Sequence, residues 1–179
     1  DSIESVWAQT MQDFELIVVD NGSTDESLEI ARSYQGRPGY ILIENKANTG
    51  FSYAVNQGIR MAKGEYVALF NNDAFAEPDW LENLIAAAEQ DPKIFGVSSL
   101  MIRHFERELA DDAGDYVTLL GFACKRGDGL RWQRYLKPGR VFSACGGAAL
   151  YRKSILDEIG LFDENFFAYF EDVDISWRA

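Results

Sequence analysis

Residues 14–25, FELIVVDNGSTD, decide the fold, because in them an apolar run leads directly into a polar turn. Every side chain of residues 14–19 except Glu15 is apolar, which is typical of a buried strand. Residues 20–25 combine Asp, Asn, Gly and Ser, which favour turns and helix N-caps. Apolar side chains then return at helical spacing, so a helix is predicted over residues 26–34. The segment therefore predicts a strand, a turn and a helix in succession.

The same alternation of strand and helix continues to residue 103. It favours right-handed crossovers and a parallel sheet that helices cover on both faces. Beyond residue 103 the regularity fades, and we expect irregular structure or short antiparallel strands before order returns at residue 144. The other predicted strands are residues 40–43, 66–70, 95–102 and 144–151, and the other helices are residues 51–63, 78–88, 154–159 and 171–179.

Two of the predicted strands end in acidic residues. Asp20 follows strand 14–19, and Asn71, Asn72 and Asp73 follow strand 66–70. Ligands of open α/β sheets bind beyond the carboxyl ends of the strands. The sequence thus predicts two acidic sites on one edge of the sheet.

Composition narrows the class of protein. The chain has 179 residues, 47% of them hydrophobic and 26% charged, as expected of one ordinary globular domain. Its net charge of −12 argues against sequence-independent binding of nucleic acid or of anionic lipid, both of which require a basic surface. Cys124 and Cys145 are expected to be reduced thiols. Because the chain starts at Asp1 rather than Met and stops inside a predicted helix, we expect it to be truncated at both ends.

Asp73 has two interpretations. Asn and Asp are common where a strand ends in a turn. The functional alternative is that Asp73 binds a divalent ion that also bridges two phosphates, because Mg²⁺ and Mn²⁺ favour carboxylate, water and phosphate oxygens. Asp20 has a similar choice between helix capping and accepting a hydrogen bond from a nucleobase N–H.

The acids near the C-terminus follow an aromatic run. Phe167, Tyr169 and Phe170 could stack on a sugar, although such residues are more often core, and Glu171 and Asp172 come directly after them. The two acids could merely complement the dipole at the start of a helix. As a catalytic pair, Asp172 would take a proton from a hydroxyl nucleophile.

Taken together, these segments resemble the family 2 glycosyltransferases, and most closely the bacterial members of the rhamnosyltransferase type. The resemblance implies the GT-A fold, a Rossmann-like and mostly parallel sheet with helices on both faces. The pieces that carry it, in the family's order, are residues 18–25 (VVDNGSTD), 48–51 (NTGF), 70–73 (FNND), 146–148 (GGA), 162–164 (FDE) and 170–174 (FEDVD).

The resemblance also implies roles for individual residues. Asp172 matches the catalytic base, with Glu171 beside it, and Asp73 matches the last acid of a metal-binding motif for Mg²⁺ or Mn²⁺. Asp20 matches the residue that reads the base. The donor nucleotide is expected to contact Asp20, Asn21, Asn48, Gly50, Asn72, Asp73 and Gly147.

The implied activity is transfer of a sugar, hexosyl or deoxyhexosyl, from a nucleotide-diphosphate donor to a hydroxyl acceptor with inversion. We expect a single catalytic domain over residues 1–179, with a nucleotide-binding half in residues 1–103 and an acceptor and catalytic half in residues 104–179. The acceptor would be a saccharide or lipid-linked saccharide of cell-surface polysaccharide synthesis. The expected location is the cytoplasm, with peripheral association at the inner face of the membrane.

Two alternatives stay open. Asn71 stands where the metal motif's first Asp often stands, which would suit a non-catalytic sugar-nucleotide-binding or scaffolding domain. A nucleotidyltransferase can share a similar core. It would need a Gly-rich phosphate loop bearing Lys or Arg near the N-terminus, and none is visible in the sequence.

Overall fold

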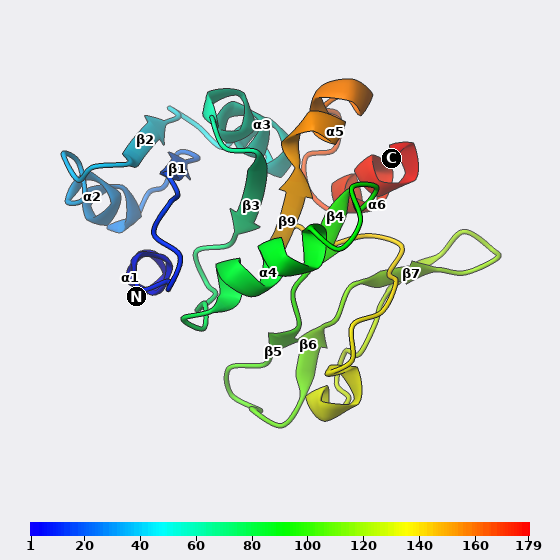
Figure 1. The fold of residues 1–179 in the computed structure, drawn as a ribbon. Helices are drawn as coiled ribbons and strands as arrows, with labels where there is room; N and C mark the ends of the chain where they lie inside the picture. Colours follow the sequence, from blue (N-terminus) through cyan, green and yellow to red (C-terminus); the bar gives the residue numbers. More distant parts are fainter.

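The computed structural model describes residues 1–179 and has an α/β architecture (Figure 1). Most predicted elements are present within a few residues of their expected bounds. The helices are α1 (Ser2–Trp7), α2 (Ser27–Arg32), α3 (Phe51–Met61), α4 (Trp80–Ala88), α5 (Lys153–Ile159) and α6 (Glu171–Arg178), with a 3₁₀ helix at Trp132–Tyr135. The strands of the main body are β1 (Leu16–Asp20), β2 (Tyr40–Glu44), β3 (Tyr66–Phe70), β4 (Gly96–Ser98) and β9 (Ala148–Arg152).

The strands of the main body form two sheets. β1 and β2 pair in parallel, from Leu16 opposite Tyr40 to Asp20 opposite Glu44. The other sheet has the order β3–β9–β4, and β9 runs antiparallel to both neighbours. All five residues of β9 are buried, the charged Arg152 among them. Its direction and its place between β3 and β4 were not predicted, because an apolar pattern identifies a strand without naming its partners.

The main core lies where α3 and α6 pack against β9. Ile59 of α3, Tyr151 of β9 and Ile175 of α6 belong to one buried cluster, and each is at most 1% exposed. Inside it the Tyr151 hydroxyl donates a 2.7 Å hydrogen bond to the carbonyl oxygen of Ala144. Because α6 is packed here through Ile175, the acids at its first turn are held against the same sheet.

A cavity of about 1180 Å³ lies between the two sheets, lined by all of β1 and β3 and by one face of α3. Most of its wall is apolar. Asp20, Asn21, Asn71, Asn72 and Gly146 also line it. The cavity therefore brings together residues that follow β1, follow β3 and precede β9, as expected for the edge of an α/β sheet.

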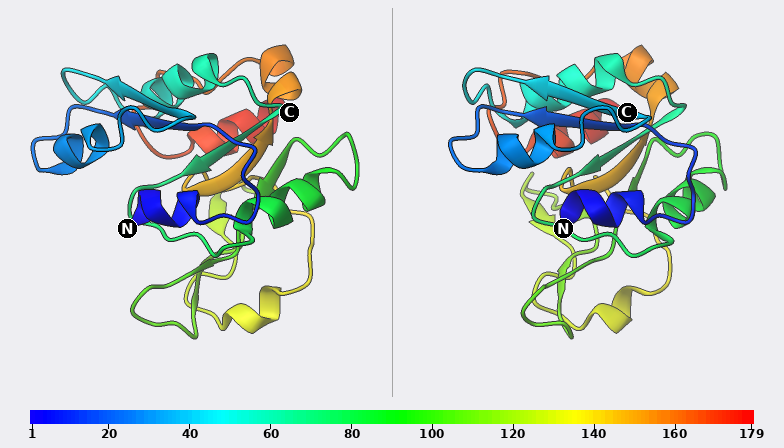
Figure 2. Two further views of the ribbon diagram at one scale, coloured as in Figure 1. Left: turned by 60° about the vertical axis from the view of Figure 1, so that its left-hand side comes forward. Right: turned by 90° about the vertical axis from the view of Figure 1, so that its left-hand side faces the viewer.

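Helix α1 lies beside the segment that joins β3 to α4 (Figure 2). The Gln9 side chain, 2% exposed, donates to the carbonyl oxygen of Glu77 and accepts from the Leu81 N–H. The Ser2 hydroxyl donates to the carbonyl oxygen of Asn71. No element was predicted for residues 1–13. In the structure they support the polypeptide that follows β3.

The prediction of one strand over residues 95–102 was wrong, because the structure divides this range between β4 and β5 (Met101–Ile102), which lie in separate sheets. Beyond residue 103 the expected short antiparallel strands are present. β5 pairs with β6 (Ala110–Asp112), and β7 (Asp115–Val117) pairs with β8 (Ala123–Lys125). The β7–β8 hairpin projects from the body of the molecule (Figure 1). No helix of the chain has the length and apolar character needed to span a bilayer.

Candidate active site

The turn after β1 is held together by its own acid. Asp20 is 6% exposed, and its Oδ2 accepts hydrogen bonds from the Gly22 and Ser23 N–H groups, each at 3.2 Å. A Cβ on Gly22 would lie 2.6 Å from the Ala47 backbone, so the turn packs tightly on the loop that follows β2. The carboxylate thus shapes the turn, and only its Oδ1 has no hydrogen bond inside the protein.

Asn21 joins this turn to the loop before α3. Its Nδ2 donates to the Asn48 side chain at 3.0 Å and to the Gly50 carbonyl oxygen at 3.1 Å. Its Oδ1 accepts from the Thr49 N–H and hydroxyl and from the Asn45 side chain. Asn21, Asn48 and Gly50 were predicted as separate site residues, and the structure places them in one network.

Gly50 connects that network to the C-terminal half. Its φ is +86°, and a Cβ there would lie 2.7 Å from the carbonyl oxygen of Phe167. The Phe51 N–H donates to the same oxygen at 2.6 Å. Only glycine combines this φ with so close an approach of two backbone segments. The loop before α3 and the polypeptide before α6 are therefore in direct contact.

The entry to α6 is strained. Tyr169 and Phe170 have φ values of +71° and +68°, in the left-handed region that side chains other than glycine rarely adopt. Such conformations cluster at functional sites. Phe167, Tyr169 and Phe170 are 60%, 81% and 60% exposed, so their interpretation as core residues was wrong. The strained turn sets Glu171 and Asp172 in the first turn of α6.

The two acids of α6 have different surroundings. Asp172 is half-buried, and its Oδ2 accepts from the Gly146 N–H at 3.2 Å while its Oδ1 accepts from the Val173 N–H at 2.8 Å. Glu171 is 7% exposed, and its buried Oε2 has no hydrogen-bond partner. Burial raises the pKa of Glu171, and the neighbouring Asp172 charge raises it further.

The glycines before β9 link these acids to the end of β3. The Asn71 N–H donates to the Gly147 carbonyl oxygen at 2.9 Å. A Cβ on Gly147 would lie 3.4 Å from the Asn71 side chain, and one on Gly146 would lie 3.3 Å from the Phe51 ring. Through Gly146 and Gly147, Asp172 at the start of α6 is therefore joined to Asn71 at the end of β3.

Asn72 and Asp73 stand apart from this network. Both are exposed, and the Asp73 carboxylate makes no hydrogen bond or ion pair within the protein. No group of three or more His, Cys, Asp or Glu side chains is arranged to bind a metal. A single unpaired carboxylate fits a divalent ion that takes its remaining ligands from phosphate and water. The donor set suits an ion that arrives with a nucleotide.

A second acidic group near Asp172 was missed by the sequence analysis. Asp112 is 0% exposed and Asp115 is 8% exposed, and Asp115 accepts a 2.9 Å hydrogen bond from the Ser143 hydroxyl. Burial raises the pKa of Asp115, with a further contribution from the Asp172 charge, and burial raises the pKa of the Cys145 thiol to about 11. The signal was available in residues 112–115, where two acids flank Ala and Gly in a segment for which only irregular structure or short antiparallel strands were expected.

Asp112 predicts a pH-dependent stability. Its Oδ1 accepts from the Gly114 N–H, its Oδ2 has no partner, and burial raises its pKa to about 7. An acid whose pKa is raised by folding binds its proton more tightly in the folded state, so stability is lost as the pH rises from about 4 to about 7. At pH 8 the ionised, buried carboxylate destabilises the fold by up to about 4 kcal/mol.

We therefore expect Asp112→Asn to raise the melting temperature by about 5 °C or more at pH 8 and by roughly a third as much at pH 5, where the wild type has lost only the first part of this stability. Thermal unfolding followed by circular dichroism at both values of pH tests this. Asp111→Asn is the matched control, because Asp111 is half-exposed and pairs with Lys125. An equal effect of Asp112→Asn at both pH values would contradict the account of Asp112.

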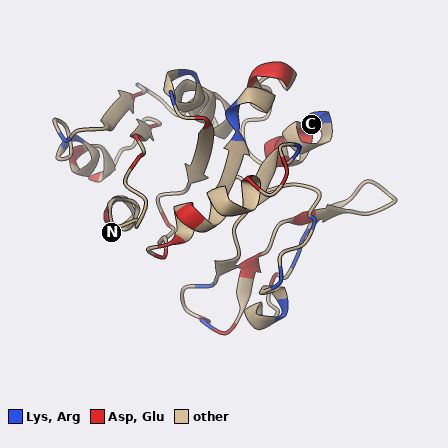
Figure 3. Cartoon of the chain, in the orientation of Figure 1, with Lys and Arg blue, Asp and Glu red and all other residues tan.

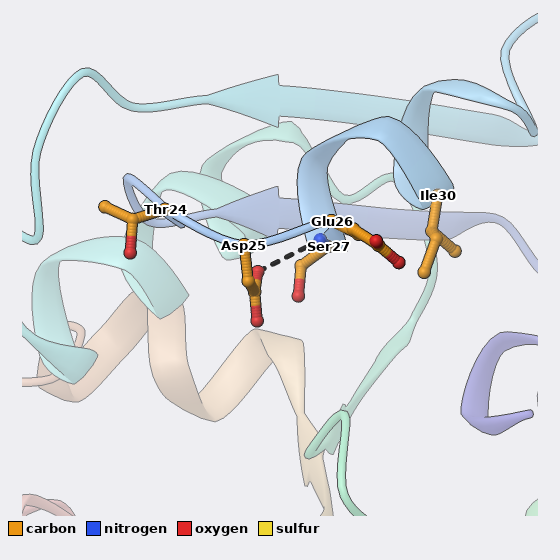
Figure 4. A pocket seen from close by; sticks show the side chains of 5 residues that line it. All are labelled: Thr24, Asp25, Glu26, Ser27 and Ile30. Atoms are coloured by element: carbon orange, nitrogen blue, oxygen red, sulfur yellow. Dashed lines mark hydrogen bonds between the residues drawn. The ribbon is translucent and has the colours of Figure 1, made fainter.

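A shallow depression of about 610 Å³ lies at the start of α2 (Figure 4). Its lining residues are Thr24, Asp25, Glu26, Ser27 and Ile30. The Asp25 carboxylate accepts a 3.0 Å hydrogen bond from the Ser27 N–H, so it already occupies this end of the helix. The depression is distinct from the network of Asn21, Gly50 and Asp172, and we assign no function to it.

Comparison with known proteins agrees with this geometry. The fold is that of the GT-A glycosyltransferases, and the family model for glycosyl transferase family 2 matches residues 1–160. The chain therefore belongs to glycosyl transferase family 2.

Two curated relatives and one solved structure illustrate the similarity. A glucosyl-dolichyl phosphate glucuronosyltransferase of Haloferax volcanii is 26% identical over 165 residues, covering 92% of this chain and 51% of the relative. A poly-beta-1,6-N-acetyl-D-glucosamine synthase of Staphylococcus aureus is 27% identical over 180 residues, covering 99% of this chain and 41% of the relative. The mannosyltransferase PcManGT of Pyrobaculum calidifontis, solved with GDP-Man and Mn²⁺, superposes with a TM-score of 0.67 at 22% identity, covering 97% of this chain and 45% of that one. The chain thus spans about half the length of these relatives or less.

Proposed function

We propose that the protein transfers a sugar from a nucleotide-diphosphate donor to a hydroxyl group of a saccharide or lipid-linked saccharide, with inversion at the anomeric carbon. The observation that carries this proposal is the network that joins the turn after β1, the loop before α3, the glycines before β9 and Asp172. Family membership supports the reaction class, and the named activities of the two curated relatives support saccharide or lipid-linked acceptors.

Asp172 is the proposed catalytic base. It would remove the proton of the acceptor hydroxyl, whose oxygen then attacks the anomeric carbon of the donor. The bond from that carbon to the diphosphate breaks, and the nucleoside diphosphate leaves with the electron pair. The N–H groups of Gly146 and Val173 hold the carboxylate in place during this step. Glu171, which is buried and lies beside Asp172 in the first turn of α6, is proposed to assist as the second acid of the pair.

The donor is proposed to bind at the edge of the cavity, mainly to the half of the domain formed by residues 1–103. The residues proposed to contact it are Asp20, Asn21, Asn48, Gly50, Asn72, Asp73 and, from the other half, Gly147. Asp20 would accept a base N–H at Oδ1. Asp73 would hold Mg²⁺ or Mn²⁺, and the ion when bound would offset charge that develops on the diphosphate. Residues 104–179 would contribute the base and the acceptor side. We further propose that the protein is a rhamnosyltransferase-like member of the family, that it acts in cell-surface polysaccharide synthesis, and that it lies in the cytoplasm with peripheral association at the inner face of the membrane.

The role of Asp73 predicts a metal-dependent change in nucleotide binding. We expect Asp73→Ala to weaken binding of the preferred nucleoside diphosphate by about tenfold or more with Mn²⁺ present, because the ion loses its protein ligand. With EDTA the variant and the wild type should bind equally. Asp79→Ala is the control, because Asp79 is exposed beside the same segment and its side chain caps nothing. Equal weakening with Mn²⁺ and with EDTA would refute the metal role.

The alternative of a non-catalytic binding or scaffolding domain makes a different prediction. Asn71, which stands in place of an acid, is the observation that favours it. It predicts nucleotide binding with no turnover of any nucleotide sugar by the protein that carries this chain. Detection of a transferred sugar, or of slow donor hydrolysis that depends on Asp172, would exclude it.

A further inference from the structure

The β7–β8 hairpin ends in an apolar tip that contacts little of the protein. The side chains of Leu119, Leu120 and Phe122 are 107%, 84% and 65% exposed. The tip is an ordered turn, because the Thr118 N–H donates to the Phe122 carbonyl oxygen and the Gly121 N–H donates back to the Thr118 carbonyl oxygen. Below it the strands pair in register from Val117 opposite Ala123 down to Asp115 opposite Lys125. A regular hairpin thus holds three large apolar side chains in solvent.

Basic residues gather in the polypeptide that follows the hairpin. Residues 125–140, which we call the basic segment, carry six of the 17 Lys and Arg residues and a single acid, Asp128, in a chain of net charge −12. Arg131, Arg134, Lys137 and Arg140 are all exposed and none makes an ion pair. Figure 3 shows these charges along the polypeptide that runs from the base of the hairpin to the 3₁₀ helix, whereas the tip is uncharged.

The combination of exposed cations and exposed apolar side chains indicates which class of partner this surface binds. The basic segment concentrates exposed cations in a chain of net charge −12, so its local charge is complementary to an anionic partner. An anionic polymer in water would use the cations and leave the three apolar side chains exposed. An anionic bilayer uses both, since its phosphates attract Lys and Arg while its interface accepts apolar side chains.

The hairpin is also connected to the candidate active site. Asp115 begins β7, accepts the Ser143 hydroxyl and carries a pKa raised in part by Asp172. The polypeptide backbone bonds Asp115 to Ser143 as well. The base of the hairpin is therefore hydrogen-bonded to the segment that leads into β9.

We propose that the hairpin tip and the basic segment form a docking surface for anionic phospholipid bilayers. Leu119, Leu120 and Phe122 enter the interfacial region, and the cations of the basic segment pair with lipid phosphates. This assigns a surface to the membrane association included in the proposed function. It rests on exposure and charge alone, and it stands or fails separately from donor binding.

The test is co-sedimentation with vesicles of phosphatidylcholine alone and with about 30% phosphatidylglycerol added. The wild type should bind the anionic vesicles at low salt and be released as salt screens the charges. The tip variant Leu119→Ser/Leu120→Ser/Phe122→Ser and the charge variant Arg131→Gln/Arg134→Gln/Lys137→Gln should each lower the partition coefficient by about tenfold or more. The circular dichroism spectra of both variants should match that of the wild type, because the substituted residues are exposed.

Matched controls replace comparable residues elsewhere. Ile30→Ser/Met61→Ser removes two exposed apolar side chains, and Lys46→Gln/Lys63→Gln/Lys93→Gln removes three exposed, unpaired cations. Both controls should bind vesicles as the wild type does.

Equal loss in controls and test variants, or absence of wild-type binding to anionic vesicles, would overturn the proposal. Full binding by the tip variant would overturn the role of the apolar tip, whatever the charge variant does. Nucleotide titration of the same variants reports on the donor site independently.

Discussion

Asp172→Asn is expected to lower the rate of sugar transfer by about 10²–10⁴-fold while leaving donor binding nearly unchanged. Asparagine has almost the same shape and can still accept the Gly146 N–H that now bonds to Asp172 Oδ2. It cannot take up the proton of the acceptor hydroxyl. The expected result is a loss in kcat with little change in the dissociation constant of the nucleotide, measured by a transfer assay and by calorimetry.

Asp174→Asn is the matched control for this substitution. Asp174 lies in the same turn of α6 and loses the same charge, but it pairs with Arg178 on the helix surface. We expect near-normal transfer by this variant. Near-normal transfer by Asp172→Asn, or an equal loss in both variants, would contradict the assignment of Asp172 as the base.

Gly50→Ala is expected to destabilise the fold by about 2–4 kcal/mol and to disrupt the site at the same time. The added Cβ would require a φ of +86° and would lie 2.7 Å from the Phe167 carbonyl oxygen and 2.9 Å from the Phe167 ring. The loop before α3 would have to move away from the turn before α6, which would break the hydrogen bond from the Phe51 N–H. Thermal unfolding should show a melting temperature lower by about 5 °C or more.

Gly36→Ala separates the conformational penalty of a positive φ from the steric clash with Phe167. Gly36 has a φ of +89°, but a Cβ there would meet nothing within 4 Å. This control carries the conformational penalty without the collision, so it should lower stability by only about 1 kcal/mol. If both variants lose the same stability, the contact between Gly50 and Phe167 is not what holds the two halves of the site together.

The local elements could be predicted because each depends on its own residues. Strand β3 was predicted at its observed bounds, and α3 and α4 followed from apolar side chains at helical spacing. The turn after β1 was read from its Asp, Asn, Gly and Ser residues. These features are set by hydrogen bonds and burial within a few residues, which a linear pattern records.

Features that depend on distant residues could not be predicted in this way. The antiparallel insertion of β9 depends on which strand edges are free. The contact between Gly50 and Phe167 joins residues more than a hundred positions apart, and nothing in the pattern around Gly50 names its partner. The same holds for the burial of Asp112, because residues 111 and 112 are identical in type and only the folded structure shows which of them loses contact with water.

The aromatic run before α6 shows a different limit. Phe167, Tyr169 and Phe170 are apolar enough for a core, yet they are exposed because the chain enters α6 through two left-handed residues. Hydrophobicity predicted their burial, and backbone geometry at the site overrode it. Such local conflicts are expected where function sets the geometry.

The central claim is that this network of loops binds a nucleotide diphosphate. Calorimetric titration of the protein that carries this chain with UDP, dTDP and GDP, each with and without Mn²⁺, tests it most directly. The account predicts that one nucleotide binds in preference to the others and more tightly with Mn²⁺. Absence of binding by all three nucleotides to the folded protein would contradict it.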